Sequence, residues 1–208
     1  ISCLSTMKFL EKASKSEHIK QFIYASSGSV YGLKEEDKVT EDLDLAPISE
    51  YNKTKMVAER VILSYADRFQ TQIIRPATVC GLSPRMRFDV AVNLLTMQAI
   101  KNKKITVLGG EQTRPNIHID DIANVYLFFI KNSQHTGIYN AGFENISILD
   151  IAKFIQKKLP KVDIEIIESN DPRSYRVDSS KLLRLGFKPS KNIDIAVNEI
   201  INKYNNGS

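Results

Sequence analysis

A tyrosine and a lysine stand four residues apart in the segment SEYNKTKMVAER, which spans Ser49–Arg60. On a helix, residues i and i+4 share a face, so Tyr51 and Lys55 would be neighbours there. A free phenol has a pKa of about 10 and is a poor base at neutral pH. A nearby ammonium favours the phenolate and makes it a better general base. The same spacing also occurs on exposed, charged helix faces, so the pair alone does not establish catalysis.

Two serines upstream of this pair supply a further polar group. The apolar run QFIYASS (21–27) is typical of a strand, and its last residues, Ser26 and Ser27, open the small-residue run SSGS. A serine hydroxyl at this point could hydrogen-bond the same substrate oxygen that Tyr51 deprotonates. The other interpretation of SSGS is a simple turn built from small residues.

Short apolar runs alternate along the chain with segments of helical periodicity. Strands are expected at 21–27, 71–81, 105–110, 137–142 and 162–169, and helices near 1–13, 50–67, 90–102, 119–131, 147–158 and 192–204. Strands separated by helices of about ten or more residues indicate an α/β fold with a mainly parallel sheet. Ligands of such sheets bind beyond the carboxyl ends of the strands. Ser26 and Ser27 fall at one such end, and Thr78 and Gly81 at another.

Four segments in order along the chain carry a family resemblance: FIYASSGSVYG, YNKTKMVAE, IIRPATVCG and RPNIHIDDIA. With them the chain resembles the extended short-chain dehydrogenase/reductase family, and more narrowly its NAD-dependent nucleotide-sugar epimerase/dehydratase branch. The resemblance covers nearly all of residues 1–208. It implies that Tyr51 is the catalytic acid/base and that Lys55 binds the nicotinamide ribose and lowers the tyrosine pKa. It implies Ser27 as the catalytic Ser/Thr, with Ser26 its nearest competitor. The residues that it places against the NAD cofactor are Tyr24, Ala25, Ser26, Tyr51, Lys55, Arg75, Pro76 and Thr78.

The resemblance also implies a Rossmann-type fold, its first part missing from the chain, with a smaller interleaved α/β portion for the substrate. We expect 1–84 and 115–141 to belong to the NAD-binding domain, and 85–114 and 142–208 to the substrate portion. Arginine forks suit diphosphate oxygens. The candidate ligands of a nucleotide-diphosphate sugar are Ser27, Arg85, Arg87, Asn93, Arg114 and Arg173, with Arg176 second to Arg173.

His118 and Asp120 invite a metal-site or catalytic-dyad interpretation. They match a family segment that is mainly structural, a loop that docks on the nucleotide-binding domain, and we therefore expect no metal site. Further along, Asp178 or Ser179 is expected to cap a short helix that ends at Gly186.

The sequence departs from the family in its glycines. None of its nine glycines forms the G-x-G-x-x-G or G-x-x-G-x-x-G pattern of the loop that holds a dinucleotide pyrophosphate. The first methionine is Met7, and the opening residues resemble a helix already in progress. The loop is therefore expected upstream of Ile1. As written, the chain is expected to bind NAD poorly or not at all, and the functional prediction concerns the complete protein.

A second departure distinguishes between reactions. The 4,6-dehydratases of this family usually carry an Asp-Glu pair directly after the catalytic Thr or Ser, where this chain has Gly28 and Ser29. Neither residue can do acid/base work at neutral pH, which favours an NAD-dependent nucleotide-sugar epimerase acting at a sugar carbon, often carbon 4. The alternatives are a dehydrogenase/reductase at that carbon, then a 4,6-dehydratase. From other classes they are a non-catalytic nucleotide-binding module and a nucleic-acid-binding protein.

Composition sets the remaining limits. The formal charge is +5, with lysines spread along the chain, and no zinc-finger, RNP-type or basic-zipper pattern is present. No apolar run approaches the roughly 20 residues of a membrane helix. Cys3 and Cys80 lie far apart, which fits a reduced, cytoplasmic setting. The resemblance adds a homodimer and a role in polysaccharide biosynthesis, and it leaves the nucleotide and the sugar open.

Overall fold

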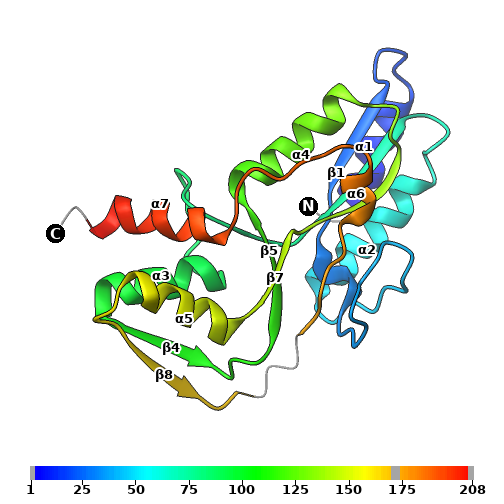
Figure 1. The fold of residues 1–208 in the computed structure, drawn as a ribbon. Coiled ribbons are helices and arrows are strands. Elements are labelled where there is room, and N and C mark those ends of the chain that lie inside the picture. The colour runs from blue at the N-terminus through cyan, green and yellow to red at the C-terminus, as the bar shows by residue number, and fades with distance from the viewer. Residues whose placement is uncertain (1–2, 170–173, 206–208) are drawn as a thin grey trace.

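The computed structural model describes residues 3–169 and 174–205 (Figure 1). Its helices are α1 (Cys3–Ser14), α2 (Glu50–Leu63), α3 (Ala91–Asn102), α4 (Ile119–Lys131), α5 (Ile148–Lys158), α6 (Ser180–Arg184) and α7 (Ile193–Asn205), with a 3-10 turn η1 (Gly28–Tyr31). Its strands are β1 (Gln21–Ala25), β2 (Gln70–Pro76), β3 (Thr78–Cys80), β4 (Lys104–Leu108), β5 (Thr113–His118), β6 (Gly137–Ala141), β7 (Glu144–Ser147) and β8 (Asp163–Ile167).

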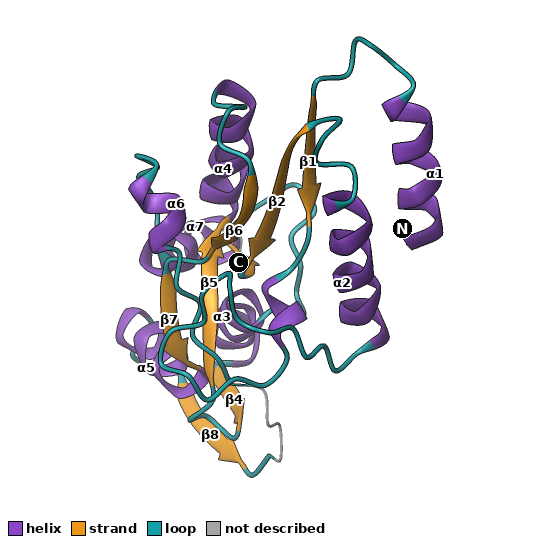
Figure 2. Ribbon diagram, turned by 90° about the vertical axis from the view of Figure 1, so that its right-hand side faces the viewer, coloured by secondary structure: helices purple, strands orange, loops and turns teal. Residues whose placement is uncertain are grey.

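The first sheet is parallel and has the strand order β1-β2-β6. Successive residues of a strand point to opposite faces. Ile73 accordingly packs with Leu10 of α1 and Ile62 of α2, whereas Ile74 packs with Val125 of α4. Figure 2 shows the result, with α1 and α2 on one side of these strands and α4 on the other. This layering places α2, the helix that carries Tyr51 and Lys55, beside β1 and β2.

The segment predicted as one strand over 71–81 is two strands in different sheets. β2 ends at Pro76 in the first sheet, and β3 begins at Thr78 and pairs with β5. Proline has no backbone N–H to continue a ladder, and as the chain leaves β2 the Ala77 N–H donates to the O atom of Ala141, the last residue of β6. A change of sheet therefore takes place at Ala77, which periodicity within an apolar run does not reveal.

The remaining strands build two small sheets. β3, β5 and β7 form one, with β5 and β7 antiparallel, and β4 pairs with β8 in parallel. β5 and β7 were not among the strands expected from the sequence. A separate core of α3, α5, α7 and β4 buries Leu95, Ile105, Ile155 and Val197. In Figure 1 these helices lie across the molecule from α1 and α2. The architecture is a mixed α/β fold with mainly parallel pairing, which confirms the predicted fold class.

Within the described residues, no helix is both long enough and apolar enough to cross a membrane.

Candidate active site

The helix with the predicted catalytic pair begins at a well-formed cap. Ser49 is the N-cap of α2, and its hydroxyl accepts a hydrogen bond from the Asn52 N–H at 3.2 Å. Such a cap satisfies one of the free N–H groups of the first turn. Tyr51 therefore lies in that turn, with 59% of its surface exposed. Lys55 follows one turn later on the same face.

Lys55 is fixed at the carboxyl end of β1. Its Nζ donates to Ala25 O at 2.6 Å and lies 4.8 Å from the centroid of the Tyr24 ring. The same Nζ lies 5.7 Å from the centroid of the Tyr51 ring. Partial burial lowers the pKa of Lys55, and Glu59 opposes that shift. The structure thus brings a half-buried cation beside Tyr51, at the edge where ligands of parallel sheets bind.

The two candidate serines have different surroundings. Ser26 is buried, and its hydroxyl donates to Glu59. Ser27 is half-buried and is the N-cap of η1, where its Oγ accepts from the Ser29 N–H at 3.3 Å. The hydroxyl of Ser26 is therefore committed to the interior, which favours Ser27 as the serine that meets a substrate.

A hydrogen-bond chain links Ser27 to the start of α2. The hydroxyl oxygens of Ser27 and Ser29 are 2.7 Å apart, and Ser29 Oγ donates to Asn52 Oδ1 at 2.6 Å. Asn52 directly follows Tyr51 in the sequence. The chain therefore holds the η1 turn against the first turn of α2 and brings the predicted catalytic residues to one end of β1.

Arg75 has its side chain inside the protein. Its guanidinium donates to both carboxylate oxygens of Glu59, at 3.1 and 2.7 Å, and to Tyr31 Oη at 2.8 Å. Tyr31 in turn donates to Asn140 Oδ1 at 2.7 Å, and burial raises the pKa of Tyr31 to about 12. A cofactor contact through the Arg75 guanidinium would have to compete with these bonds, so the predicted role of Arg75 stays a prediction.

The other predicted cofactor positions surround the end of the first sheet. Pro76 and Thr78 are half-buried on either side of the change of sheet. A Cβ added to Gly28 would lie 3.2 Å from Pro76 O, so η1 and the end of β2 approach closely. A glycine at this position permits the approach without displacing either backbone.

The loop after β3 carries the predicted substrate arginines. Arg87 pairs with Asp89 at 2.8 Å, and this pair, with a smaller electrostatic contribution from Tyr51, raises the pKa of Arg87. Arg85 is exposed on the same loop. Buried Asn93 accepts from the Gly81 N–H at 2.9 Å and donates to Arg87 O at 2.9 Å. Asn93 thus braces the loop, and Arg87 lies within electrostatic reach of Tyr51.

The last two predicted arginines lie elsewhere along the chain. Arg114, on β5, is half-buried and donates to its neighbour Thr113 O at 3.4 Å. Arg173 lies outside the described residues. Substrate contacts of both stay predictions.

Both residues predicted to cap α6 lie at its start. Ser179 is the N-cap residue, and the carboxylate of Asp178 accepts a hydrogen bond through Oδ1 from the Ser180 N–H at 2.7 Å.

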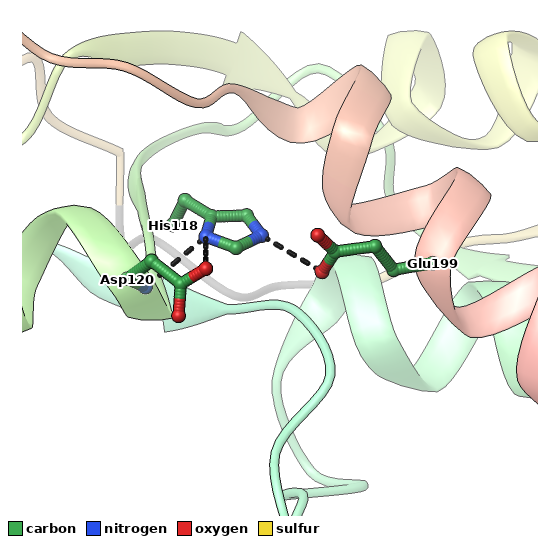
Figure 3. Close-up of side chains that lie close together, drawn as sticks. All are labelled: His118, Asp120 and Glu199. Carbon is green, nitrogen blue, oxygen red and sulfur yellow. Dashed lines mark hydrogen bonds and ion pairs between the residues drawn. The ribbon is translucent and has the colours of Figure 1, made fainter.

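Asp120 and Glu199 both lie close to the imidazole ring of His118 (Figure 3). His118 Nδ1 accepts from the Asp120 N–H at 3.1 Å, so Nε2 is the ring nitrogen that donates to Glu199, at 3.1 Å. Lys191 Nζ lies 2.7 Å from Asp120 and 2.6 Å from Glu199. An ammonium already lies between the two carboxylates, so the cluster is an ion-pair network that joins α7 to α4.

The structure also has a hollow of about 590 Å³ away from the predicted site residues. Its lining carries charges of both signs, among them Lys38, Glu41, Asp178 and Arg184, and includes none of the predicted site residues. A lining of opposed charges gives no net attraction for a charged ligand. We therefore place the candidate active site at the end of β1 and not in this hollow.

Sequence reasoning missed Glu59 and its pairing with Arg75, which was predicted only as a cofactor-binding residue. Glu59 lies four residues after Lys55, and this spacing places both on one face of α2. Arg75 interrupts the apolar run IIRP, and a charge in a buried strand needs a partner. These two signals together could have indicated the Glu59–Arg75 pair. The Ser29–Asn52 hydrogen bond has no comparable local signal.

Comparisons with known proteins identify the family of the chain. The model of the NAD dependent epimerase/dehydratase family matches residues 2–142. The chain is 31% identical to the uncharacterized UDP-glucose epimerase YtcB of Bacillus subtilis, over 74% of this chain and 49% of that protein. It is 30% identical to a dTDP-D-glucose 4,6-dehydratase of Dictyostelium discoideum, over 71% of this chain and 37% of that protein.

Among solved structures, the chain resembles the UDP-glucuronic acid 4-epimerase from Bacillus cereus in complex with UDP-glucuronic acid and NAD. The TM-score is 0.81 and the identity 31%, over 97% of this chain and 67% of that one. The chain spans about half or less of the two curated relatives named above. The family match covers most of the sequence and includes Ser27, Tyr51 and Lys55. The chain therefore belongs to the NAD-dependent epimerase/dehydratase family.

Proposed function

We propose that the full protein is an NAD-dependent epimerase of a nucleotide-diphosphate sugar, which inverts one sugar carbon, most simply carbon 4. The observation that carries this proposal is the grouping at the end of β1. There Lys55 is held on Ala25 O beside Tyr51, and Ser27 is tied through Ser29 to the residue after Tyr51. The solved relative binds UDP-glucuronic acid and NAD, which supports a substrate of this class.

The residues of this chain supply proton transfer and orientation. Tyr51 takes the proton of the sugar hydroxyl during oxidation and returns it during reduction. Lys55 provides a fixed positive charge next to the phenol, and Ser27 hydrogen-bonds the reacting oxygen. The chemistry that NAD would supply when bound is reversible transfer of hydride from and to the sugar carbon. Inversion follows when the ketone has turned its other face before it is reduced.

The residues present fit one end of this cofactor. Lys55 and the backbone at Ala25 offer a cation and carbonyl groups at the carboxyl end of β1, which suits a nicotinamide ribose. The 208 residues hold no glycine-rich fingerprint for the pyrophosphate. We therefore assign Tyr24, Ala25, Ser26, Tyr51, Lys55, Arg75, Pro76 and Thr78 to the nicotinamide side only.

Epimerisation is favoured over dehydration by the residues after Ser27. A 4,6-dehydratase needs an acid to protonate the departing hydroxyl and a base for the neighbouring carbon. Gly28 has no side chain, and Ser29 is engaged with Ser27 and Asn52. A dehydrogenase/reductase acting at the same carbon is the second candidate, because it needs only the Tyr51–Lys55 chemistry.

The wider organisation is proposed from the same family membership. Residues 1–84 and 115–141 form the cofactor side, and 85–114 and 142–208 the substrate side, and the proposed ligands of the nucleotide-sugar are Ser27, Arg85, Arg87, Asn93, Arg114 and Arg173. We further propose a cytoplasmic homodimer that serves polysaccharide biosynthesis, with no nucleic acid or membrane as partner.

The test uses the full-length protein. It is denatured, and the released NAD is quantified against chain concentration. The native protein is then incubated with a panel of nucleotide-diphosphate sugars, and products are identified by proton NMR. We expect about one NAD per chain and a 4-epimer product. Tyr51→Phe is expected to lower kcat by roughly 10²–10⁴-fold, the usual contribution of acid–base catalysis. Tyr65→Phe, beyond the end of α2, is the control.

Each other outcome has its own meaning. An activity that survives Tyr51→Phe would contradict the proposal. A product that has lost water would identify a dehydratase, and net accumulation of NADH would identify a dehydrogenase. A full-length protein that neither contains nor binds NAD would be a non-catalytic module of the same fold.

A further inference from the structure

The ammonium of Lys55 lies beside one carbonyl group and two aromatic rings. Its Nζ donates to Ala25 O at 2.6 Å. The same Nζ lies 4.8 Å from the centroid of the Tyr24 ring and 5.7 Å from that of the Tyr51 ring. The face of an aromatic ring attracts a cation within about 6 Å of its centroid. Both rings are within this range, and the ring of Tyr24 is the closer of the two.

The ring of Tyr24 is held by the core beneath α1 and α2. Successive residues of β1 point to opposite faces of the sheet, and Tyr24 packs on the face where Leu10 and Ile62 are buried. Ile23 packs on the other face, with residues of α4. The position of the Tyr24 ring is therefore set by the core. The ammonium of Lys55, in contrast, is carried by a flexible four-carbon chain.

Glu59 is the carboxylate expected to hold Lys55, since it lies one turn further along α2. Its oxygens instead accept from Arg75 and Ser26. Within the described residues, the ammonium of Lys55 is located by the Ala25 carbonyl and the two rings. A single hydrogen bond lets the ammonium swing about its acceptor, and a ring face at a second point restricts that movement.

We propose that Tyr24 is a positioning residue of the proposed reaction, whose ring, together with the Ala25 carbonyl, holds the Lys55 ammonium beside Tyr51. This inference rests on the proposed function and deepens it. A charge held at one point stabilises the phenolate form of Tyr51 more than a charge that moves into solvent, because the attraction weakens with distance and with hydration. One N–H of the ammonium is used by Ala25, and the other two remain for the nicotinamide ribose.

Tyr24→Leu in the full-length protein is the first test. Leucine keeps an apolar side chain in the core and removes the ring face. With a nucleotide-diphosphate sugar, we expect the rate at which bound NAD is reduced to fall roughly threefold to thirtyfold, the factor of one cation–π contact. The rate is read from nicotinamide absorbance. Tyr24→Phe retains the ring without the hydroxyl and should recover most of the lost rate.

The double variant Tyr24→Leu/Lys55→Met shows whether Tyr24 acts through Lys55. Once the ammonium is gone, the ring has no cation to hold, so adding Tyr24→Leu to Lys55→Met should not lower the rate further. A disturbed core, or a lost contact between Tyr24 and the cofactor, would lower the rate in both backgrounds. Non-additivity of this kind is what coupled residues show. If Tyr24→Leu lowers Tm, the same comparison is made with Tyr24→Met, whose flexible side chain adapts to irregular space.

Phe154→Leu is the matched control, because Lys158 Nζ lies 4.9 Å from the centroid of the Phe154 ring on α5, across the molecule from α2. It should leave the rate unchanged. Three results would overturn the inference alone: a Tyr24→Leu enzyme as fast as wild type, a Tyr24→Phe enzyme as slow as Tyr24→Leu, or a Tyr24→Leu effect of equal size with and without the Lys55 ammonium. A wild type that oxidises no nucleotide sugar would overturn the proposed function and the inference with it.

Discussion

At the scale of single residues, the pair Glu59–Arg75 is the most consequential polar contact outside the catalytic group. Each side chain is 2% exposed, and the two are joined by two hydrogen bonds. Glu59 also accepts from Ser26 and lies one turn beyond Lys55 on α2. A buried charge without its partner is costly. The pair therefore fixes α2 against β2 and holds the predicted catalytic residues at their common edge.

Glu59→Gln is expected to lower the free energy of unfolding by about 3–5 kcal/mol, because it leaves the buried Arg75 guanidinium without a counter-charge. Urea unfolding measures the change. Asp89→Asn is the matched control, since it removes a carboxylate from an exposed pair with Arg87. An exposed pair of this kind contributes little to stability. Equal effects of the two substitutions would show that the Glu59–Arg75 pair has no special structural role.

At the scale of elements, the turn after η1 determines how Ser27 and Ser29 are presented. Gly32 closes this turn with φ of 74°, in the left-handed region. Its N–H donates to Ser29 O, and a Cβ at this position would lie 1.9 Å from Ala46 O. The chain returning toward α2 thus passes directly over Gly32. Glycine is required here by both backbone angle and space.

Gly32→Ala is therefore expected to lower both Tm and activity, because the backbone at Ala46 or η1 must move. Gly186→Ala isolates the cost of the angle alone. Gly186 also has a positive φ, 95°, but no atom lies within 4 Å of its added Cβ. We expect about 1–2 kcal/mol of strain at Gly186 and a larger loss at Gly32, measured by thermal unfolding. A Gly32→Ala protein as stable as Gly186→Ala would mean that the turn has room to adjust.

At the scale of the whole molecule, polar contacts fasten α7 to the rest of the structure. Asp121 at the start of α4 accepts from the Ser190 and Lys191 N–H groups. Glu144 accepts from the Ile193 N–H, and His118 donates to Glu199. Figure 3 shows the part of this connection in which His118, at the start of α4, meets Glu199 of α7.

The pH dependence of this connection follows from its charges. Hydrogen bonding to Lys191 lowers the pKa of Asp120, and hydrogen bonding to Asp120 and Glu199 raises that of Lys191. The Asp120 contribution to stability is present above its unfolded pKa, about 3.9, and is lost as pH falls through the lower folded value. The Lys191 contribution is present below about 10.4 and is lost as pH rises through its higher folded value.

Lys191→Met should therefore be less stable than wild type by a constant amount between about pH 5 and 9, and the difference should shrink in stronger acid. Urea unfolding at a series of pH values measures it. Lys188→Met, which removes a nearby lysine, is the comparison. A stability difference that does not change with pH down to the acid limit would mean that the Lys191 charge is not paired as described.

The sequence by itself determined the family, the α/β class and most of the elements. The spacing of Tyr51 and Lys55, the serines after β1 and the alternation of apolar runs with helical periods are local patterns, and they led to the family and to the α/β class. Each depends on residues close together in the chain, where periodicity and helix geometry act directly.

Only the tertiary structure decided how these elements are joined. The break between β2 and β3 at Ala77 depends on which strands are available as partners. Glu59 and Arg75 are 16 residues apart, Ser29 and Asn52 are 23 apart, and Tyr31 meets Asn140 across 109 residues. Such contacts arise from the packing of distant segments, for which no local propensity exists. The candidate reacting groups could therefore be predicted from the sequence, whereas their orientation and support are set by the fold.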